Sequence, residues 1–348
     1  MSGGLLVVEK EIGRGAFGTV FRGTDPLRGP VAVKRLRQIQ DESYYETDEA
    51  WAARKRDMLL DEGLSLAAVE HPNVVRVYYA SEVSETDEIQ LVMELMTEGS
   101  AEDVLDLGPM PLDRLRDLAT ETALGLQAVH SAGMLHRDVK PGNIMIGSDG
   151  RARLSDFGFV TDTLAHGYGS RGQPYFPLAA PEVICGGPTS TRSDIYAFGG
   201  TIFRLLHGAT WMSWLDNPIA LNADGDFLQN VAWLPHVPRD WRRAVRSFMN
   251  PDPERRPQTM GQVLDVIGLL STDPPWSCDM APTGELVTWT LSHRGRRIVV
   301  EWALTGTGRT RTWHARSQPA NGDGRSRTRG NGTRFHELER FFRDFKFA

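Results

Sequence analysis

A glycine-rich segment near the N-terminus, Gly13–Val20, restricts most strongly how this chain can fold. Strand-like runs stand on both sides of it, so we expect it to join two strands and not to open a helix. A dinucleotide-binding fold needs that helix, and the context therefore argues against it. Glycine at positions 13, 15 and 18 would let the backbone close over phosphate oxygens without a Cβ clash. Alone the segment is a weak sign of a nucleotide site, because glycine-rich turns are common.

The rest of the chain to residue 270 divides into a strand-rich part and a helix-rich part. Residues 5–36 predict a β-meander, and strands are also expected at 74–83 and 88–95. Between them residues 41–69 have helical spacing, ended by His71-Pro72. After residue 112 the spacing stays helical, with later helices at 194–207, 239–249 and 259–270. This predicts an α+β fold with a small β-rich N-lobe and a larger α-rich C-lobe.

A different pattern begins near residue 276 and predicts a small separate module over residues 276–348. Alternation there suggests a hairpin of two or three antiparallel strands, then a mobile loop at 317–333 and a terminal amphipathic helix. The module is basic, with 13 Lys and Arg against 7 Asp and Glu. Its residues Trp289, Trp302 and Trp313 could stack on nucleic acid, but a module this small must bury large apolar side chains, which favours a core role.

Composition excludes several classes of protein. The chain has 348 residues, 40% of them hydrophobic and 24% charged, as in globular proteins. Its two cysteines, Cys185 and Cys278, provide neither a disulfide framework nor a metal cluster. The N-terminus lacks a signal-peptide pattern and every apolar run is shorter than a membrane span, so we expect a cytoplasmic protein without membrane contact.

Four further motifs follow the glycine-rich segment in a fixed order. They are Val31-Ala32-Val33-Lys34, His136-Arg137-Asp138 with Asn143 behind it, Asp156-Phe157-Gly158, and Ala180-Pro181-Glu182. With them the chain resembles the eukaryotic-type (Hanks-type) serine/threonine protein kinase family over residues 5–270. Singly each motif is an ordinary turn, cap or solvated charge, whereas all five in order are very specific.

The resemblance implies an active site that uses ATP and Mg²⁺. Phosphoryl transfer requires mainly positioning and charge neutralisation, and the residue types suit both tasks. Lys34 would hold the α- and β-phosphates, paired with Glu62 or its neighbour Asp61. The remaining roles fall to Asp138 as acceptor of the substrate proton, Lys140 near the γ-phosphate, and Asn143 and Asp156 as Mg²⁺ ligands.

The resemblance also implies contacts to adenine. Ile12, Val20 and Ala32 would lie above the ring and Met145 below it. Backbone groups of Glu94 and Met96 would hydrogen-bond its edge, and Met93 would guard the back of the pocket. Any of these apolar residues could instead be plain core.

Other positions bear on structure and regulation. The family pattern pairs Glu182 with Arg256, makes Asp194 an anchor for the His136 loop, and lets Arg137 receive an activation-loop phosphate. The hydroxyls available for that phosphate are Thr161, Thr163, Tyr168 and Ser170. One departure stands out. Gln173 replaces a threonine common in this family, in a segment longer than usual, which puts recognition of the acceptor in doubt.

These observations predict a Mg-ATP-dependent serine/threonine protein kinase that phosphorylates its own activation loop. Protein substrates are the expected partners, with a regulatory partner or an acidic or nucleic-acid ligand at the basic extension. The alternatives are a kinase-like scaffold or pseudokinase regulated by the extension, and a kinase that acts on a small molecule or RNA. The acidic stretch 41–51 is expected to be a solvated insertion.

Overall fold

The computed structural model describes residues 6–15, 18–36, 69–83, 88–105, 107–156, 179–212, 227–281, 283, 285–305, 310–321 and 325–346. The described residues fall into two compact units. The first draws on Met1–Gly99, Leu124–Asp138 and Asn143–Tyr168, and the second on Ser100–Ala123, Val139–Gly142 and Gly169–Ala348. The helix expected at 41–69 lies outside the described residues, as does Glu62.

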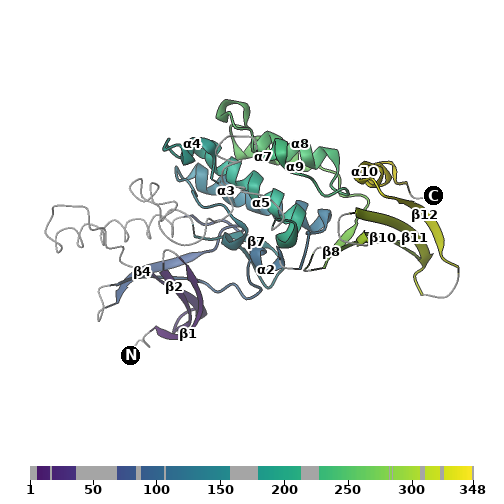
Figure 1. Ribbon diagram of the computed structural model, residues 1–348. Coiled ribbons are helices and arrows are strands. Elements are labelled where there is room, and N and C mark those ends of the chain that lie inside the picture. Colours follow the sequence, from purple (N-terminus) through teal and green to yellow (C-terminus); the bar gives the residue numbers. More distant parts are fainter. Residues whose placement is uncertain are drawn as a thin grey trace. The chain divides into compact units, whose positions relative to one another are not determined.

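The first unit contains the predicted β-rich lobe. Its strands form one antiparallel sheet in the order β1-β2-β3-β5-β4 (Figure 1). The strands are β1 (Val7–Gly15), β2 (Gly18–Asp25), β3 (Gly29–Leu36), β4 (Val77–Val83) and β5 (Glu88–Glu94). The glycine-rich segment joins β1 to β2, as the sequence predicts, with Gly15 opposite Gly18.

Side chains alternate between the two faces of this sheet. Val31, Val33 and Val92 form a buried apolar cluster on one face, with Phe21 and Tyr79 packed against it. Ala32 and Lys34 alternate with those valines along β3, so they point to the opposite face. The sheet thus separates its own hydrophobic core from the face that carries the predicted nucleotide residues.

A short strand pair completes the described part of the first unit. The strands β6 (Ile144–Ile146) and β7 (Ala152–Leu154) are antiparallel, with Met145 opposite Arg153. Asn73 holds this pair, because its side-chain amide donates to the Ala152 carbonyl and its own carbonyl accepts from the Leu154 N–H. Gly125 approaches Asn73 so closely that a Cβ there would lie 2.4 Å from the Asn73 oxygen.

The second unit holds the predicted α-rich lobe. The expected helices 194–207, 239–249 and 259–270 are confirmed with shifted ends, whereas the short α2 was not foreseen. The helices and helical turns are α2 (Ala101–Leu105), α3 (Leu112–Ser131, which continues into the first unit), η1 (Pro141–Asn143), α4 (Pro181–Ile184), α5 (Thr191–Met212), α7 (Phe227–Asn230), α8 (Arg239–Phe248), η3 (Pro253–Arg255) and α9 (Met260–Gly268).

The C-terminal extension forms a larger sheet than the sequence indicated. Five antiparallel strands lie in the order β12-β11-β10-β9-β8, so the expectation of two or three strands is wrong. The expected loop at 317–333 is wrong as well, because its ends belong to two paired strands. The elements are β8 (Ser277–Met280), β9 (Leu286–His293), β10 (Arg296–Thr305), β11 (Thr310–Pro319), β12 (Arg327–Gly332) and the predicted helix α10 (Phe335–Asp344).

Trp313 explains why the glycine-rich β12 is a strand. A Cβ at Gly330 would lie 2.8 Å from the Trp313 ring, and one at Gly332 would lie 2.6 Å from its Nε1. The indole therefore covers a strip of bare backbone, which compensates for the poor strand propensity of the segment. Trp289 and Trp313 are buried, which confirms the predicted core role for two of the three tryptophans, whereas Trp302 is half-buried.

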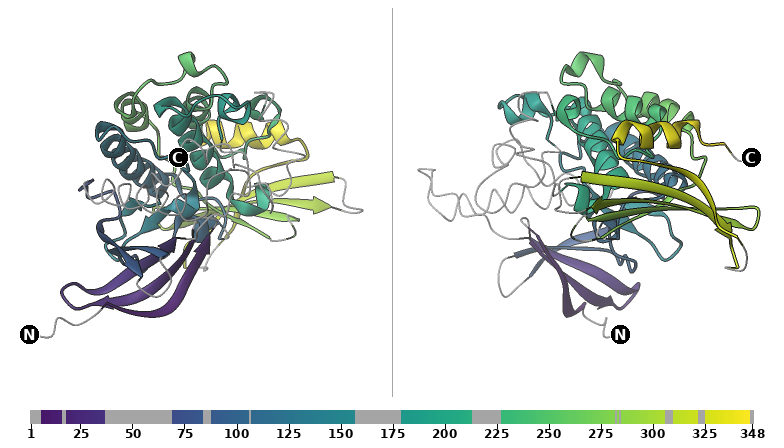
Figure 2. Two further views of the ribbon diagram at one scale, coloured as in Figure 1. Left: turned by 90° about the vertical axis from the view of Figure 1, so that its left-hand side faces the viewer. Right: turned by 45° about the vertical axis from the view of Figure 1, so that its right-hand side comes forward.

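The extension packs against the helical lobe and not only against itself. The helix α10 lies across one face of the C-terminal sheet (Figure 1, Figure 2). His236, in the segment before α8, contacts the rings of Trp289 and Phe342 at centroid distances of 5.8 and 6.2 Å. An ion pair of 2.9 Å joins Arg242 of α8 to Glu339 of α10. Both aromatic contacts and an ion pair therefore join the extension to the helical lobe.

Among the described helices, none has both the length and the apolar character needed to cross a membrane.

Candidate active site

The register of the first sheet sets the predicted nucleotide residues on one face. Val20 lies opposite Lys34, and Lys34 lies opposite Leu91. Directly opposed residues share a face, so these three form a row across β2, β3 and β5. Ala32 and Met93 form the next row on the same face. Ala32, Lys34 and Met93 are buried, whereas Ile12 on β1 is 49% exposed.

Gly13, at the start of the glycine-rich turn, is loosely packed among the described residues. Gly13 lies opposite Val20, and a Cβ at Gly13 would meet only the Val20 Cβ, at 4.0 Å. Packing within the described residues therefore does not demand glycine at this position, and close approach by a ligand remains a reason for it.

Lys34 forms the central ion pair of the site. Its Nζ lies 2.7 Å from Asp156 Oδ1 and donates a hydrogen bond to that oxygen. The Lys34 side chain is only 4% exposed, whereas that of Asp156 is one third exposed. Within the described part of the chain, Asp156 Oδ2 has no hydrogen-bond partner. Asp156 therefore neutralises the lysine with one oxygen and presents the other as a hard acceptor.

Asn143 is bound directly to Asp138. The Asn143 side-chain amide donates to Asp138 Oδ2 and to the Asp138 carbonyl, both at 2.8 Å. Because Nδ2 is the donor in both bonds, Oδ1 is left as an acceptor, and it has no partner among the described residues. Asn143 thus fixes the carboxylate of Asp138 and offers a second hard oxygen.

His136 and Ser155 support this pair from behind. His136 Nδ1 accepts from the Asp138 N–H at 3.2 Å, and its Nε2 lies 3.0 Å from the Ser155 carbonyl. A backbone N–H can only donate and a carbonyl can only accept, which assigns the proton to Nε2. Ser155 in turn donates its N–H and hydroxyl to the Asn143 carbonyl. These hydrogen bonds connect the backbone around Asp138, Asn143 and Ser155.

Two non-glycine residues near this pair have left-handed backbone angles, one in the loop before Asp138 and one in the segment after β7. Arg137 has φ of 68° and Asp156 has φ of 59°. Such conformations cost about 1–3 kcal/mol each and cluster at functional sites. Arg137 precedes the predicted catalytic Asp138, and Asp156 is a predicted Mg²⁺ ligand; the hydrogen bonds of His136 and Asn143 to Ser155 join the two segments.

One of the two backbone polar groups of Glu94 forms a hydrogen bond within the protein. Its N–H donates to the Arg76 carbonyl at 2.9 Å. This N–H is therefore occupied, and only the Glu94 carbonyl remains to meet the predicted role toward adenine. Met96 and Met145 are half-buried.

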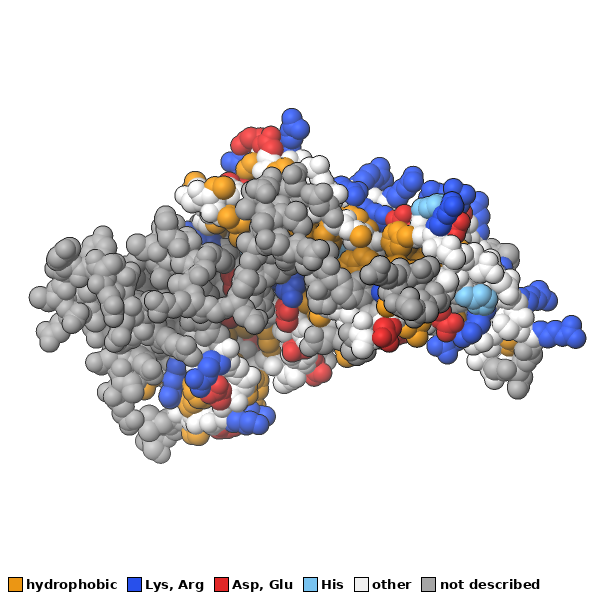
Figure 3. All heavy atoms as spheres, viewed as in Figure 1, with side chains coloured by type: hydrophobic (Ala, Val, Ile, Leu, Met, Phe, Trp, Pro, Cys, Tyr) orange, Lys and Arg blue, Asp and Glu red, His pale blue; other side chains and the backbone are white. Residues whose placement is uncertain are grey.

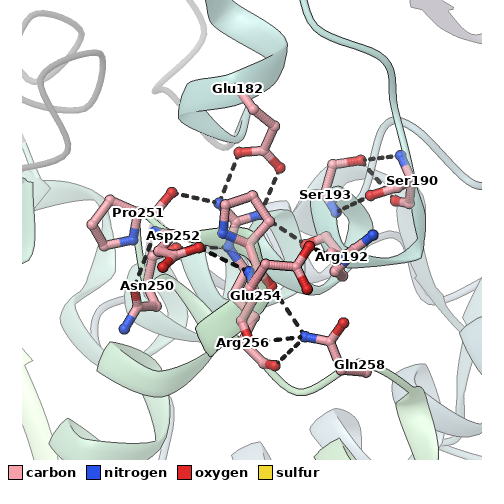
Figure 4. Close-up of polar contacts among 11 residues, drawn as sticks. Glu182, Ser190, Arg192, Ser193, Asn250, Pro251, Asp252, Glu254, Arg256 and Gln258 are labelled. Atoms are coloured by element: carbon pink, nitrogen blue, oxygen red, sulfur yellow. Dashed lines mark hydrogen bonds and ion pairs between the residues drawn. The ribbon is translucent and has the colours of Figure 1, made fainter.

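In the second unit the predicted Glu182–Arg256 pair is confirmed. Both Arg256 terminal nitrogens donate to the Glu182 carboxylate at 2.7 Å, and the guanidinium is completely buried (Figure 4). Arg256 also donates to the carbonyls of Asn250, Pro251 and Arg192. The Arg256 side chain therefore links Glu182 of α4 to the backbone of the segment before η3. Asp194 is buried, and Lys140 is half-buried.

Several predictions fall outside the described residues. They concern Glu62, Asp61, Phe157, Gly158, Gln173 and the hydroxyls of Thr161, Thr163, Tyr168 and Ser170. Conversely, sequence reasoning missed Asn73 and Ser155. Asn73 bonds the backbone of β7, far away in the sequence, and Ser155 bonds the Asn143 carbonyl, so no local pattern marks either residue. The His71-Pro72 pair before Asn73 indicates only a helix end.

Comparison with known proteins agrees with this geometry. The family model described as protein kinase domain matches residues 6–266. Serine/threonine-protein kinase pkn2 of Myxococcus xanthus is 32% identical over 285 residues, covering 76% of this chain and 32% of that protein. PknL of Mycobacterium tuberculosis is 35% identical, covering 59% of this chain and 49% of the relative. A probable serine/threonine-protein kinase, PknB of Lactococcus lactis, is 30% identical, covering 73% of this chain and 37% of that protein. The chain thus spans between a third and a half of the length of these curated relatives.

Proposed function

Because this chain belongs to the protein kinase family, we propose that it is an active serine/threonine kinase that transfers the γ-phosphoryl group of ATP to protein hydroxyls with the help of Mg²⁺. The family implies ATP use and protein substrates. One observation carries the proposal of activity: the first unit alone contains both the Lys34–Asp156 ion pair and the Asp138–Asn143 hydrogen bonds.

The described residues fit a magnesium ion. Asp156 Oδ2 and Asn143 Oδ1 are oxygen acceptors without protein partners in the described structure, and Mg²⁺ takes one or two such ligands together with phosphate oxygens and water. When bound, the ion would neutralise charge on the phosphates. Asp156 and Asn143 would hold it.

The chain's own residues then have distinct tasks. Lys34 is buried and held by β3, so it is positioned to bind phosphate oxygens on the sheet face below the glycine-rich turn. Asp138 would accept the proton of the substrate hydroxyl, and its carboxylate is already oriented by Asn143. Lys140 would bind the γ-phosphate, and Glu62 would pair with Lys34. Val20 and Ala32, away from the sheet core, would contact adenine together with Ile12 and Met145, and Met93 would guard the back of the pocket.

The test is an acceptor screen. Purified protein with labelled ATP and Mg²⁺ is offered a serine/threonine peptide library, a tyrosine peptide library, RNA and small hydroxyl compounds. We expect label on serine or threonine peptides and on the chain's own activation segment, located by mass spectrometry. Transfer only to a non-protein acceptor would overturn the assignment. Measurable ATP binding without transfer to any acceptor would favour the scaffold alternative.

A further inference from the structure

A groove in the C-terminal extension lies outside the catalytic machinery. It has a volume of about 450 Å³ and is formed by β12, α10 and the residues after that helix. Ligand sites of a few hundred cubic ångströms suit a small molecule or a few residues of peptide. Phe341 and Phe345 line it and are half-buried, so part of each ring faces the opening.

Three cations line this groove without ion-pair partners. Arg329, Arg340 and Lys346 are exposed, and none forms a hydrogen bond or an ion pair within the described part of the chain. By contrast, two other arginines of the second unit form ion pairs, Arg242 with Glu339 and Arg316 with Glu301. Figure 3 shows Lys and Arg side chains gathered over α10.

The two carboxylates of the groove are already engaged. Glu337 accepts from the Arg334 N–H in the capping box of α10, and Asp344 is bonded to Arg343. The hydrogen bond from Arg343, and more distantly the charges of Arg340 and Arg239, hold the Asp344 pKa below its ordinary value. Asp344 is thus paired with Arg343, and against the single charge of Glu337 the three lining cations leave the groove with a net positive charge, so it can accept an added anion.

We propose that this groove binds a phosphorylated serine or threonine segment of a partner protein. A phosphate group carries nearly two negative charges and several acceptor oxygens, which match a pair of arginine forks and a lysine. The exposed parts of the Phe341 and Phe345 rings would accept an apolar side chain beside the phosphate. That such segments are the chain's own products rests on the proposed function; the binding itself does not.

Nucleic acid fits the groove less well. Sequence-tolerant binding to a strand uses a long cationic path and exposed aromatic rings on which bases stack. Trp289 and Trp313 are buried in the core of the extension, so the rings that the groove presents are the partly exposed ones of Phe341 and Phe345. Glu337 and Asp344 interrupt the cationic lining, so a continuous polyanion would meet like charge, whereas a single phosphate can sit between the cations.

The experiment uses the full chain without ATP. Fluorescence anisotropy measures its affinity for a synthetic peptide library with a fixed central phosphothreonine and randomised neighbours. The matched libraries carry threonine or glutamate at that position. The groove variant combines Arg329→Gln with Arg340→Gln, and the charge-matched control combines Arg294→Gln with Arg297→Gln, which lie outside the groove. Thermal melting confirms that both variants fold.

We expect the phosphothreonine library to bind about tenfold or more tightly than either matched library, which is about 1.4 kcal/mol. The groove variant should lose that preference and the control should keep it. Equal binding of the three libraries, or undiminished binding by the groove variant, would overturn the proposal. So would tighter binding of an oligothymidylate that the groove variant abolishes, because the site would then be one for nucleic acid. Without ATP the assay does not depend on catalysis. A failure to bind phosphopeptide would therefore not count against the proposed kinase activity, and a lack of kinase activity would not count against phosphopeptide binding.

Discussion

His136 satisfies two backbone groups of the catalytic loop at once, through one neutral ring. His136→Leu would remove the ring nitrogen that accepts from the Asp138 N–H and the one that donates to the Ser155 carbonyl. A buried polar group left unpaired costs about 1–3 kcal/mol. We expect a loss of unfolding free energy in that range, measured by urea denaturation, and a reduced kcat because Asp138 is no longer held. Ser155→Ala is the control, since it removes one hydroxyl and keeps both bonds to His136. Wild-type kcat in His136→Leu would contradict the positioning role.

Two other buried histidines make stability depend on pH. Burial lowers the pKa of His207 and of His236 to about 3, from 6.5. Burial is the largest cause of both pKa shifts; the charge of Arg242 contributes to each, and His207 contributes to that of His236. Below pH 6.5 these histidines bind protons in the unfolded chain but not in the folded chain. The free energy of unfolding therefore has its full value above pH 6.5 and falls as the pH drops toward 3. Each histidine contributes about 1.4 kcal/mol per pH unit in that window.

His236→Phe tests this linkage. Among the described residues His236 Nδ1 has no hydrogen-bond partner, and its ring lies against aromatic side chains, so phenylalanine should be accepted. We expect little change in unfolding free energy at pH 7.5. Between pH 6 and 5 the loss of stability should be shallower by about 1.4 kcal/mol per pH unit than in the wild type. Urea denaturation across this range gives both slopes, and parallel slopes would show that His236 does not titrate as described.

At the scale of elements, β12 depends on the bare backbone under Trp313. Gly330→Ala would place a methyl group 2.8 Å from the indole ring of Trp313. Either the ring or the strand would then have to shift. Overpacking of this kind costs about 1–3 kcal/mol. Gly268→Ala is the matched control, because no atom lies within 4 Å of its added Cβ in α9, and it should be neutral or slightly stabilising. Thermal melting compares the two, and equal melting temperatures would refute the role of Trp313.

Phe342 joins the extension to the helical lobe. It packs against Trp276, Trp289 and His236 and is 7% exposed. Phe342→Ala should cost about 3–5 kcal/mol. Because the contact is shared, the extension and the lobe should still unfold in one transition, seen by calorimetry. Phe335→Ala removes a ring that contacts Trp302 within the extension and serves as the control. A separate early transition for the extension would mean that it folds independently.

Elements also show what a sequence can and cannot reveal. The sheet of the first unit was predictable, because its strands are close in the chain and alternate clearly. The strand β12 was not, because its glycines and arginines resemble a loop and only Trp313, from another strand, makes it a strand. The docking of α10 depends on Arg242 and His236, which lie about a hundred residues away in the sequence and have no local signature.

At the scale of the whole molecule, the predicted catalytic residues of the first unit come together, and the family match over residues 6–266 accounts for their order. The motifs were readable because phosphoryl transfer restricts which residue types can stand at each position. The supports Asn73 and Ser155 were not readable, because their bonds use backbone groups brought close only by the fold. The boundaries 5–270 and 276–348 remain a prediction, although the extension belongs to the same compact unit as the helical lobe.

The measurement that tests the central claim is Mg²⁺-dependent transfer of labelled γ-phosphate from ATP by the wild type and by Asp138→Asn. The variant keeps the shape of the side chain and removes the carboxylate that Asn143 orients. We expect wild-type transfer to serine or threonine, and a fall of about 10²–10⁴-fold in the variant with ATP binding retained. Equal transfer by both proteins, or none by the wild type despite ATP binding, would contradict the account.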